Sequence, residues 1–131
     1  SYTSPDKDCN IRTKRLNKEL SYFTIPYTIT IQEKMILLKF NYIDTVVTIT
    51  FYNNYPFVSP SMSINDISYI KLLEDISKQN NLRFDTKNCL CCNSYLCPNR
   101  WKPGYKLEYI MNELEMNINL IKDFLHRNEN D

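Results

Sequence analysis

The sequence has no alanine, only one glycine and one tryptophan, and no long apolar run. Its bias towards isoleucine, asparagine, lysine and tyrosine indicates an AT-rich genome. The longest apolar stretch, MILLKF, is far too short to cross a bilayer, and the N-terminus SYTSPDKD lacks the apolar core of a secretory signal. Neither sign of charge is in large excess, because the sequence has 16 basic and 15 acidic residues. We therefore expect a soluble intracellular protein, cytoplasmic or nuclear, that binds neither membrane nor nucleic acid through a global charge.

Cysteine is present in an odd number, five, and four of the five lie between Cys89 and Cys97. A secreted disulfide scaffold usually carries an even set spread along the chain, so this pattern favours a metal site or a catalytic site in a reducing compartment. Cys89 and Cys92 have the Cys-x₂-Cys spacing that zinc prefers. One interpretation of the loop is thus a structural zinc site, with Cys89, Cys91, Cys92 and Cys97 as ligands. A disulfide between neighbouring loop thiols is a further alternative without a sequence signal of its own.

The length of 131 residues suits a single domain with a full core, and we expect residues 1–8 to form a flexible arm. Apolar residues at helical spacing predict helices at 10–23, 66–79 and 105–127, the first with Ile11 in its apolar set and charged residues such as Arg12 in between. Asp66 is the expected N-cap of the second helix. Runs of β-branched and aromatic residues predict strands at 27–31, 35–42 and 44–52, joined by hairpins, and a short edge strand at 61–64. This order predicts an α+β fold: an antiparallel β-meander with an N-terminal helix, an inserted helix and a long C-terminal helix.

Three segments resemble parts of one known family, and they occur in that family's order. KRLNKEL (Lys14–Leu20) is similar to the first helix of ubiquitin-conjugating enzymes, and YPFVSP (Tyr55–Pro60) resembles their Tyr-Pro-Phe-x-Pro-Pro turn. WKPGYKLEYIMNEL (Trp101–Leu114) resembles their Trp-x-Pro segment and the helix after it. The divergent composition suggests a distant member, such as one from a large DNA virus. The family's His-Pro-Asn tripeptide is missing, and QNNLRF stands in its place.

The resemblance implies an enzyme that carries ubiquitin or a ubiquitin-like protein as a cysteine thioester and passes it to a lysine or to a ligase. Such transfer needs a thiolate nucleophile and no cofactor. Reading back from Trp101, the family pattern favours Cys92 as the nucleophile; Cys89 comes next and then Cys91. Asn81 is the nearest substitute for the family's asparagine, whose amide is suited to stabilising an oxyanion.

The resemblance also implies two partner surfaces. Phe57 and Pro103 match the ligase-docking patch of the family, whereas Lys14, Arg15 and Lys18 match first-helix residues that help to bind the activating enzyme. The simpler interpretations are a buried Phe57 and an ordinary solvated helix face. The alternative function is a catalytically inactive variant that acts as a protein-binding module, with or without zinc in the Cys89–Cys97 loop. The missing His-Pro-Asn favours this alternative, and the retained cysteines and Trp-x-Pro oppose it.

Overall fold

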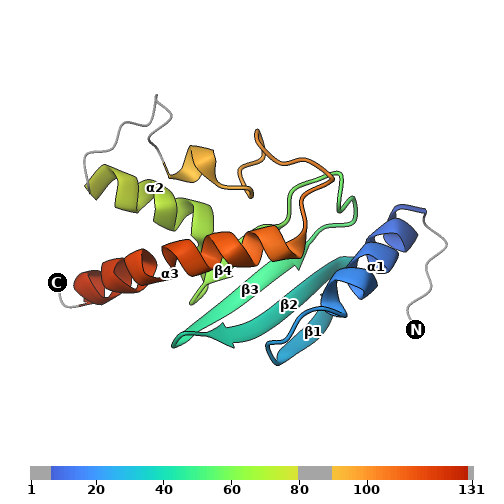
Figure 1. Cartoon of the computed structure of the whole chain (residues 1–131), viewed down its shortest axis with the longest axis horizontal. Helices are drawn as coiled ribbons and strands as arrows, with labels where there is room; N and C mark the ends of the chain where they lie inside the picture. The colour runs from blue at the N-terminus through green and yellow to red at the C-terminus, as the bar shows by residue number, and fades with distance from the viewer. Residues whose placement is uncertain (1–6, 80–89, 130–131) are drawn as a thin grey trace.

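The protein, seen in a computed structural model that describes residues 7–79 and 90–129, is a five-stranded antiparallel sheet with three α-helices on one side of it (Figure 1). The strands follow one another across the sheet in chain order: β1 (Tyr27–Gln32), β2 (Met35–Tyr42), β3 (Thr45–Phe51), β4 (Ser61–Ile64) and β5 (Ile67–Ser68). The helices are α1 (Lys7–Leu20), α2 (Tyr69–Gln79) and α3 (Leu107–Glu129), and a short 3₁₀ helix, η1, spans Cys91–Asn93. The α+β class, the meander and the C-terminal helix predicted from the sequence are confirmed.

Three hairpins of the sheet close with two-residue turns in which both residues have positive φ, the backbone of type I′ turns. These pairs are Glu33 and Lys34, Ile43 and Asp44, and Asn65 and Asp66. The prediction that Asp66 caps the second helix is wrong, because Asp66 lies in the last of these turns. The helix begins three residues later, where the Ser68 hydroxyl accepts a hydrogen bond from the Lys71 amide at 3.3 Å.

Strict alternation in the central strands builds the core. Odd positions of β3 and even positions of β2 face the helices, where they are buried. Helix α3 meets them with one apolar face whose residues are four or three apart. The most deeply buried residues of the sheet and of α3 are Leu38, Val47, Ile49, Phe51, Ile64, Ile110, Leu114, Ile118 and Ile121.

The first helix differs from the prediction at both ends. It begins at Lys7 and ends at Leu20, so residues 7 and 8 of the expected flexible arm are helical, and residues 1–6 lie outside the described chain. The helix ends before the predicted Phe23, because a turn at 21–22 leads into β1.

The apolar set of the first helix is also different from the prediction. Ile11 is 41% exposed, whereas Arg12 is fully buried. The Arg12 Nη1 donates hydrogen bonds to the carbonyl oxygens of Lys34, at 2.5 Å, and Phe51, at 3.0 Å. These acceptors lie in the β1–β2 turn and at the end of β3, where backbone carbonyls need partners. Arg12 therefore holds α1 against the sheet through one guanidinium nitrogen that donates to two backbone carbonyls.

Candidate active site

The cysteine loop, defined as Leu90–Arg100, leads from α2 towards α3. Cys92 lies in η1, where its free thiol is exposed, and the free thiol of Cys97 is half-buried. Cys91 is disulfide-bonded, a state that the expected reducing compartment does not favour. Two predicted site residues, Cys89 and Asn81, lie outside the described residues, so no geometry relates them to Cys92.

Helix α2 holds the start of the loop. The Leu90 amide donates a hydrogen bond of 3.1 Å to the hydroxyl of Ser77. Ser77 is fully buried near the end of α2, two residues before its last residue, so its position is set by core packing. The backbone just before Cys91 and Cys92 is therefore fixed to a rigid element.

Helix α3 holds the loop immediately after Cys92. The Glu113 carboxylate accepts hydrogen bonds from the Ser94 hydroxyl at 2.6 Å and from the Tyr95 amide at 2.7 Å. It also accepts one from the Tyr69 hydroxyl of α2, at 2.6 Å. The Tyr69 oxygen in turn accepts a bond of 2.8 Å from the Asn117 side-chain amide. One carboxylate thus joins α2, α3 and the loop.

Burial of the Tyr69 ring raises the pKa of its hydroxyl above 10.0, and the negative charge of Glu113 raises that pKa further. The same causes act on Tyr55, where burial and then the Glu19 carboxylate raise the pKa. Both hydroxyls therefore stay protonated and act as hydrogen-bond donors at any physiological pH.

A cation lies beside the residue that follows Cys92. The Arg100 Nη1 donates a hydrogen bond to the Asn93 carbonyl, and its guanidinium lies 4.7 Å from the centre of the Tyr95 ring. Arg100 is therefore part of the loop's own packing and not simply a solvated charge. Further along, the buried Leu96 has its carbonyl bound by the Ser59 hydroxyl at 3.0 Å.

Trp101 joins the two segments that follow the family pattern. Its Nε1 donates a hydrogen bond of 2.7 Å to the carbonyl of Pro56, in the YPFVSP turn. The Trp101 ring also packs against Tyr55, with the ring centres 6.1 Å apart. Two residues on these segments point outwards: Phe57 is 59% exposed and Pro103 is exposed. The simpler expectation of a buried Phe57 is therefore wrong.

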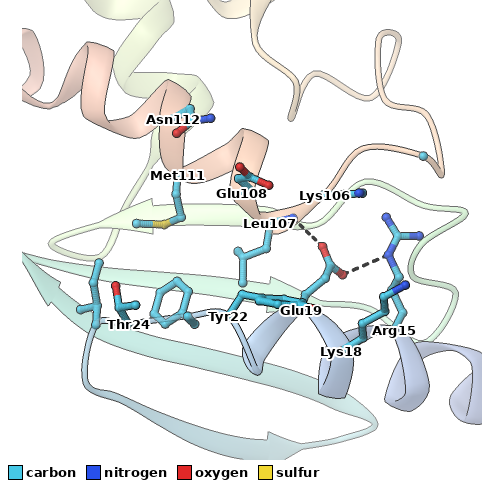
Figure 2. A pocket seen from close by; sticks show the side chains of 13 residues that line it. Arg15, Lys18, Glu19, Tyr22, Thr24, Lys106, Leu107, Glu108, Met111 and Asn112 are labelled. Atoms are coloured by element: carbon cyan, nitrogen blue, oxygen red, sulfur yellow. Dashed lines mark hydrogen bonds and ion pairs between the residues drawn. The ribbon is translucent and has the colours of Figure 1, made fainter.

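A groove of about 850 Å³ lies on another part of the surface, between α1 and the start of α3 (Figure 2). Of the residues that the structure describes, no cysteine lines it. The groove is therefore separate from the thiols of Cys92 and Cys97.

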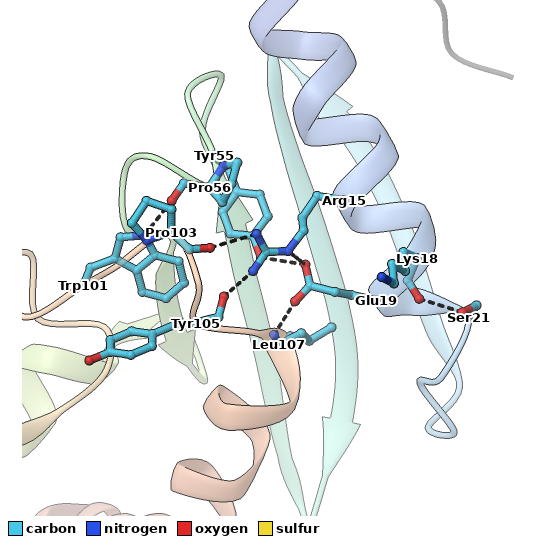
Figure 3. A network of polar contacts seen from close by, with 10 residues as sticks. All are labelled: Arg15, Lys18, Glu19, Ser21, Tyr55, Pro56, Trp101, Pro103, Tyr105 and Leu107. Atoms are coloured by element: carbon cyan, nitrogen blue, oxygen red, sulfur yellow. Dashed lines mark hydrogen bonds and ion pairs between the residues drawn. The ribbon is translucent and has the colours of Figure 1, made fainter.

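A polar network fastens the start of α3 to α1, as Figure 3 shows. Arg15 forms an ion pair of 3.1 Å with Glu19 and donates hydrogen bonds to the carbonyls of Pro103, at 2.8 Å, and Tyr105, at 2.6 Å. The Glu19 carboxylate also accepts bonds from the Tyr55 hydroxyl, at 2.8 Å, and from the backbone amide at the first residue of α3, at 2.5 Å. Both side chains are thus fully engaged within the fold.

The three predicted first-helix residues consequently differ from one another. Arg15 has its guanidinium committed to the network of Figure 3. Lys14 and Lys18 are exposed, and neither ammonium forms an ion pair with a described residue. Only these two are open to a partner.

A metal centre was the alternative expectation for the cysteine loop. Within the ranges 7–79 and 90–129, no three cysteine, histidine or acidic side chains are grouped as metal ligands. Of the predicted ligands, Cys91 is disulfide-bonded in this structure and Cys89 is outside those ranges, so zinc binding by this loop stays a prediction. Across the same described ranges, no helix has the length and apolar character needed to cross a bilayer.

Sequence reasoning missed the residues that hold the loop. Glu113 is a glutamate within an amphipathic helix, and Ser77 is a small polar residue in another, so neither stands out by type. The one available signal was position: Glu113 lies three residues after Ile110 and one before Leu114, at the edge of the buried face. A carboxylate at that position must either be solvated by water or accept hydrogen bonds from protein donors.

Comparisons with protein-family models, with curated proteins and with solved structures found no match. The likeness to ubiquitin-conjugating enzymes therefore rests on the three segments of the sequence. Two of these, YPFVSP and WKPGYKLEYIMNEL, are joined by the Trp101–Pro56 hydrogen bond.

Proposed function

We propose that this protein carries ubiquitin or a ubiquitin-like protein as a thioester on Cys92 and transfers it to a lysine or to a ligase. The observation that carries the proposal is the exposed Cys92 thiol on a loop held by Ser77 before it and by Glu113 after it. A nucleophile that receives an acyl group from another protein must be accessible and must also be held in place. Cys97, the other described free thiol, is half-buried and is the weaker candidate.

The chemistry needs two acyl transfers. In the first, the Cys92 thiolate attacks the thioester that joins the modifier to the activating enzyme; a new sulfur–carbon bond forms as the old one breaks, and the activating enzyme's thiolate leaves. In the second, a lysine amine attacks the new thioester, the Cys92 thiolate leaves, and the amine gives up a proton. A ligase thiol replaces the amine in the other route. Neither step uses a metal or an organic cofactor.

The oxyanion formed in each step calls for a hydrogen-bond donor aimed at it. The family's His-Pro-Asn, whose asparagine is suited to this role, is missing here. Asn81 remains the proposed substitute, on the basis of its place in the sequence. The proposal requires that an Asn81→Ala variant lose more of the lysine-transfer rate than of the rate of thioester formation.

The partner surfaces follow from what is exposed. Phe57, Val58 and Pro103 lie on the two segments that Trp101 joins, and all three are exposed. An exposed aromatic ring beside proline is a suitable anchor for a ligase. Lys14 and Lys18 are proposed to meet the activating enzyme, while Arg15 supports the fold that presents them.

The second candidate function is an intracellular protein-binding module without catalytic activity. The observation that favours it is the exposed Phe57 and Val58, which could bind a ligase with no thioester formed. Conjugation takes place inside cells, so both candidates imply an intracellular protein.

A charging reaction tests the proposal. The full chain is incubated with activating enzyme, ATP and ubiquitin, and the products are separated with and without a reducing thiol. We expect an adduct that the thiol removes, present in Cys97→Ser and absent as a thioester in Cys92→Ser. A folded protein that forms no adduct with activating enzymes for ubiquitin or its relatives would leave only the binding module.

A further inference from the structure

The groove between α1 and α3 has an apolar floor and charged side chains at one end (Figure 2). Phe23, Ile25 and Met111 are half-buried and apolar, and they form the floor beside the buried Leu107. Tyr22, 78% exposed, stands at the edge. The volume of about 850 Å³ is within the range of ligand-binding pockets, about 300–1,000 Å³.

Three cations (Arg15, Lys18 and Lys106) and two carboxylates (Glu19 and Glu108) line the groove, so its lining carries one net positive charge. Arg15 and Glu19 neutralise each other through their ion pair. Lys18 and Lys106 are exposed, and among the described residues neither has an acidic partner. Figure 2 places both lysines at the same end, next to Arg15. This end therefore attracts a negative group, and the floor next to it attracts an apolar one.

The only glycine of the chain, Gly104, also lines this groove. Its φ is not positive, so the backbone does not require glycine there. A Cβ added at Gly104 would meet nothing within 4 Å, so packing does not require glycine either. The missing side chain leaves open space in the lining of the groove, where the backbone of another chain could approach closely.

We propose that this groove binds a short segment of a partner protein in which apolar residues are flanked on one side by acidic residues. The apolar side chains fill the floor formed by Phe23, Ile25 and Met111, and the acidic ones face Lys18 and Lys106. The segment passes over Gly104. The groove contains neither Phe57 nor Cys92, although it shares Lys18 with the surface proposed for the activating enzyme. Peptide binding in the groove does not depend on thioester chemistry.

The test uses the full chain and a phage-displayed library of random dodecapeptides. Selected peptides are synthesised with a fluorescent label, and their dissociation constants are measured by anisotropy. We expect enrichment of glutamate or aspartate next to leucine or phenylalanine. Gly104→Trp fills open space, so it should leave the thermal midpoint unchanged while it weakens binding by about tenfold or more.

Charge variants complete the test. Lys18→Glu and Lys106→Glu should each weaken binding by about fivefold, and more at low salt than at high salt. Lys102→Glu is the matched control, because Lys102 is exposed on the same connection but does not line the groove, and its binding should stay within about twofold. The inference is overturned if no peptide is enriched, if the enriched peptides lack acidic residues, or if Gly104→Trp binds them equally well. Self-association that Gly104→Trp abolishes, measured by sedimentation, would assign the groove to a second copy and would also overturn it.

Discussion

Replacing Glu113 by alanine removes the acceptor of three hydrogen bonds that join α2, α3 and the cysteine loop. The Ser94 and Tyr69 hydroxyls still accept hydrogen bonds, from the Leu96 amide at 3.0 Å and from the Asn117 side-chain amide at 2.8 Å, but both hydroxyls and the Tyr95 amide lose their acceptor. A hydrogen bond to a charged group contributes about 1.5–3 kcal/mol, and bonds that share one carboxylate do not add fully. We therefore expect Glu113→Ala to lower the free energy of unfolding by about 3–4 kcal/mol.

The assay is urea unfolding, followed by far-ultraviolet circular dichroism and by the fluorescence of Trp101, the only tryptophan. Glu113→Gln keeps an acceptor oxygen but loses the charge, so its loss should be about 1–2 kcal/mol. Glu115→Ala is the control, an exposed glutamate two residues further along α3, and its effect should stay within about 0.5 kcal/mol. The reasoning is refuted if Glu113→Ala loses no more than Glu115→Ala with an unchanged dependence on urea.

Three further predictions concern stability. Folding raises the pKa of Tyr69 above the ordinary 10.0, so the contribution of this tyrosine to the free energy of unfolding should be constant below pH 10 and should fall above pH 10 by about 1.4 kcal/mol per pH unit. Tyr69→Phe should remove this contribution to the slope. An equal slope in the wild type and in Tyr69→Phe would contradict the prediction. Ile43 is a β-branched residue at φ 46°, so Ile43→Asn should raise the urea midpoint, with a gain of about 1 kcal/mol, and a lower midpoint would count against the turn geometry. Phe57→Ala should change the free energy of unfolding by less than about 0.5 kcal/mol, because the ring is exposed. Trp101→Phe should lower the free energy of unfolding by about 1–2 kcal/mol, because it loses the hydrogen bond to the Pro56 carbonyl. A loss above about 0.5 kcal/mol for Phe57→Ala would mean that this ring belongs to the core.

The sheet could be predicted from the sequence because its residues carry two independent signals. Val47, Ile49 and Phe51 alternate with polar residues, and the connections are short enough to leave only hairpins. The turns themselves gave little help, because none of them contains glycine. Alternation in the strands therefore determined the register.

Helix ends could not be predicted as well, because they depend on local competition between neighbouring groups. Asp66 and Ser68 are both good capping residues, and the choice fell to Ser68 because Ile67 and Ser68 first pair with β4. Arg12 was missed for a related reason: a single arginine on a basic helix resembles its solvated neighbours, and only the position of the Lys34 and Phe51 carbonyls makes it a core residue.

In the candidate site, the position of Cys92 relative to Trp101 could be predicted from the sequence. The residues that hold the cysteine loop in place could not. Cys92 could be reached by counting back from Trp101, because family patterns preserve spacing along the chain. Glu113 and Ser77 hold that loop through contacts made across 19 and 13 residues, which no local pattern encodes. Asn81 and Cys89 have no described geometry to compare with their predicted roles.

The most direct test of the central proposal is to locate the acyl group. Cys92→Ser is charged with activating enzyme, ATP and ubiquitin, and the product is digested and analysed by mass spectrometry, with Cys97→Ser as the matched control. The proposal predicts an ester on residue 92 that resists reducing thiol and yields to hydroxide, while Cys97→Ser still forms a thiol-sensitive adduct. A thiol-sensitive adduct that persists in Cys92→Ser would contradict it, because the acyl group would then reside on another cysteine.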